Sequence, residues 1–542
     1  MQRLEAFISP SDIPQNRPLS NQQAQNNAGG FSYTISCWSQ LDRFLILGSS
    51  GGTYYQGERE LTRDNAAAVF SCIAKDGPRT VARIVEISTS GRAPKNDPAL
   101  FALALCASVG TPEVFPETAS NRDLYAGWRA TRAAAFAALP QVARTGTHLY
   151  TFAQYVRKTR RSGKGLRKAI GRWYTEKDLN QLAYQAVKYR QREGWSHRDM
   201  LRRARPKTGT SNPVFDWICH GTVTDSTPPL IHAFEALQKG GFTPENAARL
   251  IRQYRLPHEA VPSELLTSPD VWQALFEDMP PMAMLRNLSR LTRLNLFETP
   301  ANLALVSATF LNEANLAKAR LHPLSILLAL RAYSLGYGRN LDQRWKPDRQ
   351  IQKTLNEAFY LAFKTTEPTN KRILLGVDVS GSMGCGTIAN CALTAREAAA
   401  ALAMTVARTE PNHIITAFSH EMVPLNISPK MTLEQVVRET SDLPFGRTDC
   451  ALPMLYALQE ELAVDAFVIL TDNETWFGRV HPSAALKRYR EKTGIPAKLI
   501  VIGMTATNFS IADPADPGMF DIAGFDAAIP PLVSDFIRED VV

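Results

Sequence analysis

Hydrophobic positions divide the chain into two parts with different periods. Between residues 63 and 365 apolar residues recur at i, i+3 and i+4 over most of the length. This spacing places side chains on one face of an α-helix, so it predicts a largely helical part. Beyond residue 369 the pattern changes. Apolar runs alternate there with helical segments, the runs near 373–379, 413–419, 466–472 and 497–504 and the helices near 388–407, 449–463 and 482–490.

The helical part is interrupted by Pro, Gly and Asn or Asp at intervals of about 15 to 20 residues. Antiparallel helix pairs that repeat every 35 to 45 residues or so predict an all-α solenoid of HEAT-like repeats. An irregular helical domain is the alternative, because the repeat is not clear residue by residue.

The second part predicts an α/β module with a doubly wound parallel sheet, because buried strands alternate with helices. The polar segment 365–370 is the expected linker, so we place the helical module at 1–368 and the α/β module at 369–542. The first 30 residues are rich in Asn, Gln and Pro and predict a flexible arm. The segment 44–55 has a central Gly-Ser-Ser-Gly-Gly run and predicts a hairpin.

Charge is distributed unevenly over these modules. Residues 369–542 hold 14 Lys+Arg and 21 Asp+Glu, a net charge of −7, whereas residues 1–368 carry +16. This asymmetry predicts an acidic module for a metal ion and a basic module for a polyanion. No run of 18 apolar residues occurs, so we expect no membrane span. Seven dispersed cysteines without a C-x-x-C pair predict reduced thiols and a cytoplasmic location, not a disulfide framework or a zinc cluster.

The positive charge is concentrated at residues 157–207, which carry 17 Lys+Arg and only 4 Asp+Glu. Aromatic residues such as Trp195 are interleaved with them, although we expect Trp173 and Tyr184 to lie in the core and not to stack on bases. Phosphates attract cations and unpaired bases stack on flat rings, so the segment predicts nucleic-acid binding. A solvated helix face is the alternative, but so little acidic compensation favours nucleic acid. His197 lies at an expected helix start, where we expect an exposed ring that contacts RNA.

Oxygen-bearing side chains occur in three separate loops of the α/β module. Asp378, Ser380 and Ser382 follow one apolar run, Thr448 precedes a helix, and Asp472 ends another run. Strand carboxyl ends share one edge of an open α/β sheet, so we expect these side chains to converge there. Carboxylate and hydroxyl oxygens suit a small hard cation. Capping of the following helix is the alternative for the two serines, but it leaves Thr448 and Asp472 unexplained.

This pattern resembles the metal-ion-dependent adhesion site of a von Willebrand factor A domain, over about residues 369–542. The resemblance implies that Ser380, Ser382 and Thr448 bind the ion directly. It implies that Asp378 and Asp472 bind it directly or through water. The implied ion is Mg²⁺, with Mn²⁺ or Ca²⁺ as alternatives, and one position stays open for a partner's carboxylate or another anion.

A second resemblance covers nearly the whole chain. The segments Gly165–Ile170, Trp173–Tyr174, Lys188–Arg192 and Gly194–Asp199 resemble the TROVE domain of the Ro autoantigen family. The short N-terminal arm, the cysteine usage and the compact linkers resemble those of its bacterial members. The order of a basic helical module and then an adhesion-type domain is also similar to that family. The resemblance implies that the HEAT-like solenoid is closed into a ring by the A domain.

The same resemblance implies a function in RNA quality control. Small noncoding Y RNA would bind the outer basic surface, and single-stranded 3′ ends of misfolded RNAs would enter a central hole. An exoribonuclease such as polynucleotide phosphorylase is the implied protein partner, and we expect a monomer in the absence of RNA. The residues expected to bind RNA are Lys164, Arg167, Lys168, Arg172, Lys188, Arg190, Arg192, His197 and Arg198.

Two other functions compete with this non-enzymatic interpretation. A metal-dependent RNA hydrolase would need several carboxylates around paired ions. The expected site contains Asp378 and Asp472, with Asp449 and Glu474 near them in sequence, but mostly hydroxyl ligands. Such a set suits anion binding better than activation of water. A scaffold that binds only protein is the other alternative, and the basic segment argues against it.

Overall fold

The computed structural model describes residues 7–34, 36–47, 66–90, 96–110, 122–159, 163–206, 212–319, 321–338, 343–380, 395–441, 446–504, 509–523 and 529–538. Among these, the C-terminal module contains a six-stranded sheet in the order β11-β9-β8-β5-β6-β7. All pairs are parallel except β6 with β7. The strands are β5 (Ile373–Asp378), β6 (His413–Phe418), β7 (Met422–Pro424), β8 (Ala466–Thr471), β9 (Lys498–Gly503) and β11 (Met519–Ala523).

Helices cover both faces of this sheet, as expected for a doubly wound fold. One face packs against α18 (Ala395–Thr409) and α22 (Ile529–Arg538), which share a buried core with Leu375 and Val377 of β5. The other packs against α20 (Leu452–Gln459) and α21 (Pro482–Thr493), together with Leu374. Successive side chains of β5 therefore enter different cores, which explains why its apolar run is continuous.

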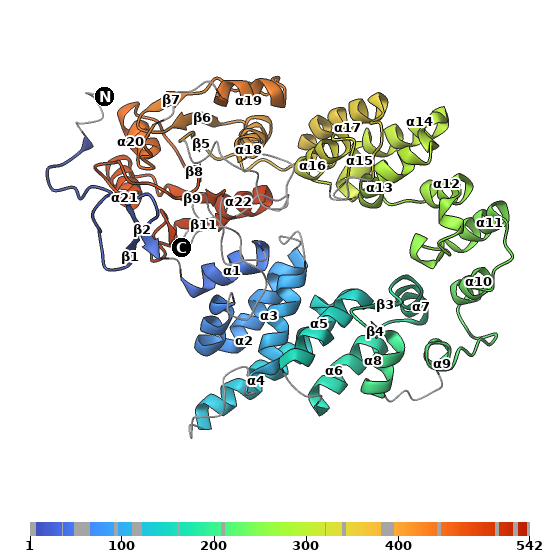
Figure 1. The fold of residues 1–542 in the computed structure, drawn as a ribbon. Coiled ribbons are helices and arrows are strands. Elements are labelled where there is room, and N and C mark those ends of the chain that lie inside the picture. The colour runs from blue at the N-terminus through green and yellow to red at the C-terminus, as the bar shows by residue number, and fades with distance from the viewer. Residues whose placement is uncertain are drawn as a thin grey trace.

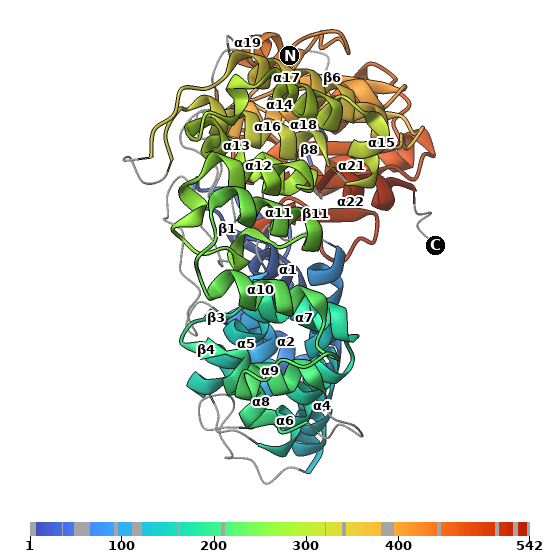
Figure 2. The ribbon, with the colours of Figure 1, turned by 90° about the vertical axis from the view of Figure 1, so that its right-hand side faces the viewer.

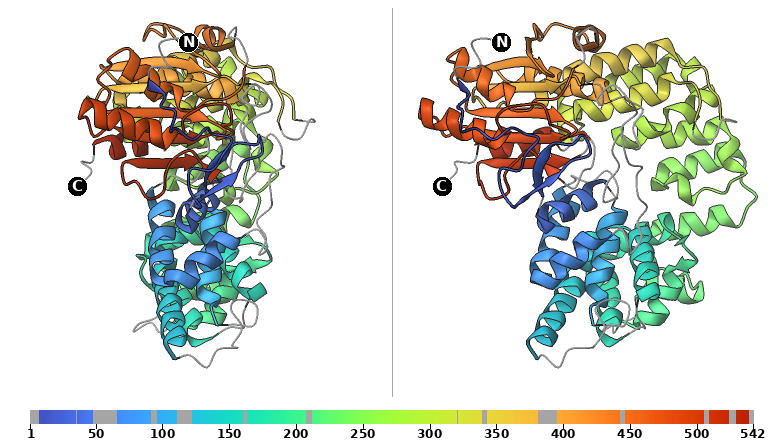
Figure 3. Two further views of the ribbon diagram at one scale, coloured as in Figure 1. Left: turned by 90° about the vertical axis from the view of Figure 1, so that its left-hand side faces the viewer. Right: turned by 60° about the vertical axis from the view of Figure 1, so that its left-hand side comes forward.

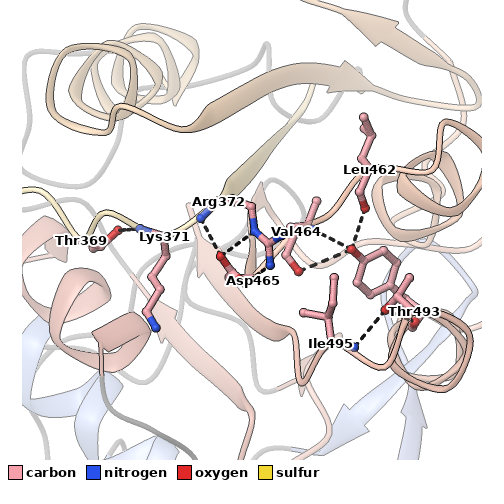
Figure 4. A network of polar contacts seen from close by, with 9 residues as sticks. Thr369, Lys371, Arg372, Leu462, Val464, Asp465, Thr493 and Ile495 are labelled. Carbon is pink, nitrogen blue, oxygen red and sulfur yellow. Dashed lines mark hydrogen bonds and ion pairs between the residues drawn. The ribbon is translucent and has the colours of Figure 1, made fainter.

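Polar contacts fix the register of the central strands at their amino ends (Figure 4). Arg372 forms a bidentate ion pair with Asp465, with bonds of 2.9 and 2.5 Å from Nε and Nη2. Tyr489 of α21 donates to the Leu462 carbonyl at 2.7 Å and accepts from the Val464 amide at 2.7 Å. These bonds tie the starts of β5 and β8 to each other and to α21. The carboxyl ends of both strands consequently meet at one edge.

The rest of the described chain is mainly helical. Helices close in sequence pack on one another, in part across an intervening helix, and the module curves from α1 beneath the sheet to α17 beside it (Figure 1). The helices are α1 (Cys37–Leu47), α2 (Ala67–Ser90), α3 (Asp97–Ser108), α4 (Arg122–Val142), α5 (Gly146–Thr159), α6 (Lys164–Thr175), α7 (Leu179–Lys188), α8 (His197–Ala204), α9 (Pro213–His220), α10 (Pro229–Gln238), α11 (Pro244–Tyr254), α12 (Pro269–Glu277), α13 (Pro281–Arg293), α14 (Pro300–Phe310), α15 (Glu313–Lys318), α16 (Pro323–Ser334) and α17 (Arg349–Ala362).

Contacts at both ends of the helical module close the chain into a ring, which confirms the predicted two-module architecture (Figures 1 and 3). At one end α1 packs against β11. At the other, Arg331 of α16 lies 3.5 Å from Glu397 of α18 and 3.9 Å from Glu434 of α19 (Leu433–Ser441). The view in Figure 2 shows the ring edge-on, with the α/β module at one end and α4, α6 and α8 at the other.

The N-terminal segment differs from the predicted flexible arm. Strands β1 (Gln23–Gln25) and β2 (Phe31–Thr34) form a small antiparallel sheet with β10 (Phe509–Ser510) of the C-terminal module. The Asn26 amide is buried and donates a 2.7 Å bond to the carbonyl of Thr475. Polar composition therefore gave the wrong expectation, because partners distant in sequence satisfy these polar side chains.

The predicted hairpin is also wrong in its first half. Residues 44–47 lie in α1, where Phe44 and Leu45 are fully buried. Tertiary packing against α2 and α3 overrides the strand preference of this aliphatic run. Residues 48–55 lie outside the described residues.

No helix in the described part of the chain is both long and apolar enough to cross a membrane. The cysteines described, Cys37, Cys72, Cys106, Cys219 and Cys450, are free thiols.

Candidate metal centre and nucleic-acid interface

The carboxyl edge of the sheet carries four of the five predicted metal ligands. Asp378 ends β5, and its Oδ2 accepts a 2.7 Å hydrogen bond from Oγ1 of Thr471, the last residue of β8. Its Oδ1 accepts a 2.8 Å bond from the amide of Ser380. Asp472 directly follows Thr471, and its Oδ1 accepts from the amide of Glu474 at 3.1 Å. Asp378, Ser380 and Asp472 are all buried.

Thr448 reaches the same edge from the loop before α20. Its side chain is buried, and its carbonyl accepts bonds from the amides of Trp476 at 3.1 Å and Phe477 at 3.2 Å. These bonds join the Thr448 loop to the loop that follows Asp472. Ser382, the fifth predicted ligand, lies outside the described residues.

The electrostatics of this edge fit a bound cation. Burial and, after it, the nearby negative charge of Asp472 raise the pKa of Asp378 to about 7, which favours its neutral form. Two buried carboxylates that disfavour each other's ionisation gain from an adjacent positive ion. Where the structure describes the chain, no three His, Cys, Asp or Glu side chains form a metal-binding group. The predicted ligands that are described at this edge are the carboxylates of Asp378 and Asp472 with the hydroxyls of Ser380 and Thr448, oxygen groups that suit Mg²⁺.

Two further carboxylates near this edge are bound by the N-terminal segment. Glu474 accepts a 2.7 Å bond from Nδ2 of Asn27 and a 3.0 Å bond from the amide of Ala28. Asp449 accepts a 2.7 Å bond from Nε2 of Gln15, and burial raises its pKa to about 6. Both carboxylates therefore hold the N-terminal segment against this edge of the sheet. Neither contact is predictable from the local sequence pattern.

A cation and two aromatic rings flank the candidate metal centre at the surface. The guanidinium of Arg447 lies 5.4 Å from the ring centroid of Trp476 and 4.9 Å from that of Phe477. Arg447 is exposed, and Phe477 keeps 40% of its surface accessible. Arg447 precedes Thr448 directly, so a positive group lies at the rim of the site.

The predicted RNA-binding residues of α6 form one exposed face of an amphipathic helix. Lys164, Arg167, Lys168 and Arg172 are all exposed. The opposite face, which includes Trp173, is buried. The 3.6-residue period separates the two faces. Arg172 also forms an exposed ion pair with Glu176 at 2.8 Å, so part of its charge is compensated.

Four more predicted RNA-binding residues lie near the junction of α7, the β3–β4 hairpin and α8. The strands are β3 (Gln191–Arg192) and β4 (Trp195–Ser196). Lys188 is half-buried, with its ammonium 5.4 Å from the ring of Tyr184. Arg190 lies over Phe234, with 5.0 Å between the guanidinium and the ring centroid. Arg192 and Arg198 are exposed.

His197 does not have the exposed ring that we expected. It is only 3% exposed, and its Nδ1 lies 2.7 Å from the hydroxyl of Tyr174 while its Nε2 lies 3.2 Å from the carbonyl of Gln185. Burial lowers its pKa to about 4, so the ring is neutral at pH 7. Ser196 caps α8 in a capping box with Asp199, which explains the helix start but not the burial. The ring anchors α8 to α6 and α7 and has no surface to offer RNA.

Each of the two modules matches the model of a known protein family, and the whole chain is similar to proteins of known name. A family model described as the TROVE domain matches residues 24–229 and 249–335, and one described as the Ro60 vWA domain matches 372–537. The chain is 40% identical to RNA-binding protein RO60 of Deinococcus radiodurans, over all of both proteins. It is 33% identical to RNA-binding protein RO60 of Caenorhabditis elegans, over 95% of this chain and 90% of that one. The crystal structure of the Deinococcus radiodurans RO (RSR) protein superposes with a TM-score of 0.73 and 39% identity, covering 93% of this chain and 99% of that one.

Proposed function

The chain belongs to the Ro60 family of TROVE-domain proteins, and we propose that it is an RNA-binding protein of RNA quality control. The curated relatives are named RNA-binding proteins, and neither name denotes an enzyme. The observation that carries the proposal is the exposed basic face of α6. Lys164, Arg167 and Lys168 are exposed on the side of the helix opposite its buried apolar face.

The finer proposal concerns two classes of RNA. Y RNA binds the outer basic surface, where Lys168 and Arg172 supply phosphate contacts. Misfolded RNAs bind through a single-stranded 3′ end that enters the ring. The closed arrangement of α1 to α17 with the α/β module supports this second mode, because a closed ring selects for a free end rather than for a base sequence (Figure 1).

At the sheet edge we propose a Mg²⁺ site held by Asp378, Ser380, Ser382, Thr448 and Asp472, with Mn²⁺ or Ca²⁺ as alternatives. The buried carboxylates and hydroxyls support it. A bound ion would offer an electrophilic position to an anionic group. Arg447 at the rim adds a second positive group for the same anion. The partner that we propose is an exoribonuclease such as polynucleotide phosphorylase, recognised through a surface carboxylate.

A metal-dependent hydrolase is the weaker candidate. Three of the five proposed ligands are hydroxyls, a set that suits the binding of an anion better than the activation of water between paired ions. We propose that the protein acts in the cytoplasm and is monomeric without RNA.

Direct binding tests the central proposal. A fluorescent structured RNA should bind the purified protein, and the logarithm of the binding constant should fall linearly with the logarithm of salt between 50 and 200 mM. Sequencing of RNA that copurifies with the protein would identify the natural ligand. Absence of binding at 50 mM salt, with no copurifying RNA, would overturn the proposal. Cleavage of the RNA with Mg²⁺, lost in Asp378→Ala, would favour the hydrolase.

A further inference from the structure

A second basic feature lies between α5, the β3–β4 hairpin and α8, within the basic segment 157–207. It is a polar pocket of about 290 Å³ lined by Arg157, Gly194, Trp195, Asp199, Arg202 and Arg203. Three elements build it: α5 contributes Arg157, the β3–β4 turn contributes Gly194 and Trp195, and α8 contributes the others. One water occupies roughly 30 Å³ in the liquid, so the pocket has room for a group much larger than a single water.

Aromatic stacking holds two of the three guanidinium groups in place. Arg203 lies 4.6 Å from the ring centroid of Trp195, and Arg157 lies 5.8 Å from it. The ring itself is buried and anchored, since its Nε1 donates a 3.1 Å bond to Gln154. A guanidinium that rests on a fixed ring loses less side-chain freedom when it binds a ligand. The pocket is therefore partly preorganised.

Carboxylates that line the pocket do not neutralise the positive charge of its three arginines. Where the chain is described, no carboxylate lies within ion-pair distance of Arg157, Arg202 or Arg203. Asp199 lines the pocket, but its Oδ2 already accepts 3.0 and 2.6 Å bonds from the amide and hydroxyl of Ser196. Three cations against one engaged carboxylate leave a net positive pocket. Such an arrangement is costly by self-repulsion unless an anion enters it.

We propose that this pocket binds one phosphate group of the RNA backbone. Planar guanidinium groups bind phosphate oxygens through two parallel N–H···O bonds, and convergence of arginines from two helices fixes the position of the group. This inference rests on the proposed RNA-binding function and adds a specific anchor to it. The exposed residues of α6 attract phosphates broadly, whereas the pocket holds one phosphate at a defined place relative to α5 and α8.

The test compares the Arg157→Gln, Arg202→Gln double variant with wild type in the RNA titration. We expect the slope of log binding constant against log salt to fall by about one, because one phosphate contact is lost. At 150 mM salt this corresponds to a dissociation constant raised about fivefold. The matched control is Lys430→Gln with Lys487→Gln, which removes two exposed charges from the C-terminal module and should leave both quantities unchanged.

A second experiment determines whether the pocket binds only a phosphate of the RNA backbone or also free inorganic phosphate. Inorganic phosphate replaces chloride at constant ionic strength while RNA is bound. Competition in wild type that disappears in the double variant would mean that the pocket also takes free phosphate. Absence of competition in both, with the expected loss of slope, would mean that it takes only the RNA phosphate. Both outcomes support the pocket.

Other results would overturn the pocket proposal, and they can be told apart from a failure of the proposed RNA-binding function. If wild type binds RNA and the double variant binds it with equal affinity and slope, the pocket proposal fails and the proposed function stands. If wild type binds no RNA, both fail. Should the glutamine variant melt at a lower temperature, Arg157→Lys with Arg202→Lys decides. Lysine keeps the positive charge but lacks the planar guanidinium that forms two parallel hydrogen bonds with a phosphate. We therefore expect this variant to bind RNA more weakly than wild type at an unchanged melting temperature. Affinity equal to wild type would overturn the proposal.

Discussion

The side-chain amide of Gln15 donates a 2.7 Å hydrogen bond to Oδ1 of Asp449, although 434 residues separate them in sequence. The same nitrogen donates a 2.7 Å bond to the carbonyl of Val480, and the Gln15 side-chain oxygen accepts from the hydroxyl of Thr475. Gln15 is fully buried. Because Asp449 follows Thr448 directly, the N-terminal segment fixes a loop that carries a proposed metal ligand.

Removing this contact should destabilise the protein. In Gln15→Ala the buried carboxylate of Asp449 loses a donor, which costs about 1–3 kcal/mol. We expect a lower midpoint of urea unfolding and faster hydrogen exchange in β1 and β2. The matched control is Gln22→Ala, an exposed glutamine of the same segment, which should change neither. Equal behaviour of the two variants would show that the bond contributes nothing to docking of the arm.

The meeting of Asp378 and Asp472 at one edge of the sheet was predictable from local signals and one general rule. The apolar runs before Asp378 and Asp472 mark two buried strands, and parallel strands bring their carboxyl ends together. No such rule links Gln15 to Asp449. A buried glutamine has the same local sequence signal as an exposed one, so only the folded partners distinguish them.

His197 shows the same limit in the segment proposed to bind RNA. The Ser196–Asp199 spacing predicts a helix start, and the capping box confirms it. Whether the first residue of that helix faces water depends on Tyr174 and Gln185, which lie on other helices. The basic face of α6 was predictable because one helical period separates its charges from its apolar residues. The pocket around Trp195 was not, because three elements build it.

Burial of His197 makes the stability of the helical module depend on pH. Its pKa in the folded protein is about 4, below the ordinary value of 6.5, so the unfolded chain binds the proton more readily. Stability is therefore fully present above about pH 6.5 and is lost as pH falls toward 4. Between pH 7 and pH 5 the loss from this residue is about 2 kcal/mol.

Urea unfolding of wild type and His197→Gln at both pH values measures this contribution. Glutamine cannot titrate, so we expect the variant to be less stable than wild type at pH 7 but to lose less on acidification. The exposed His220, at the end of α9, serves as the control in His220→Gln, which should keep the wild-type pH dependence. An unchanged acid sensitivity in His197→Gln would contradict the burial argument.

Metal binding should depend on Asp378 and leave the RNA surface intact. Mg²⁺ should raise the thermal midpoint of wild type by mass action, because the ion binds the folded state. In Asp378→Ala we expect no such shift and no heat of binding in a Mg²⁺ titration. RNA affinity should stay within about twofold, since the basic residues lie on the other module. Asp535→Ala removes an exposed carboxylate of α22 and should retain the thermal shift. Equal loss of RNA affinity in Asp378→Ala would place RNA at the metal site.

The exposed face of α6 should contribute phosphate contacts that can be counted. Lys168→Ala combined with Arg172→Ala should weaken RNA binding and reduce the salt slope by up to about two, one for each contact. Arg172 already pairs with Glu176, so its share should be the smaller one. Circular dichroism should be unchanged, because neither side chain is buried. Unchanged affinity and slope between 50 and 200 mM salt would remove α6 from the interface.

The ring predicts a preference for RNA with a free single-stranded 3′ end. Its closure depends on α1 against β11 and on α16 against α18, so a strand can enter only from an end. A structured RNA with a 3′ tail should therefore bind more tightly than the same RNA with the tail paired into a blunt end.

The Lys168→Ala, Arg172→Ala variant should weaken the binding of both RNAs by the same factor if those residues act on the outer surface alone. The ratio between tailed and blunt RNA would then persist. Competition of the two RNAs at fixed salt measures this ratio, and a 5′ tail of equal length controls for added phosphates. If tailed and blunt RNAs compete equally, no strand enters the ring and the outer basic surface accounts for all binding.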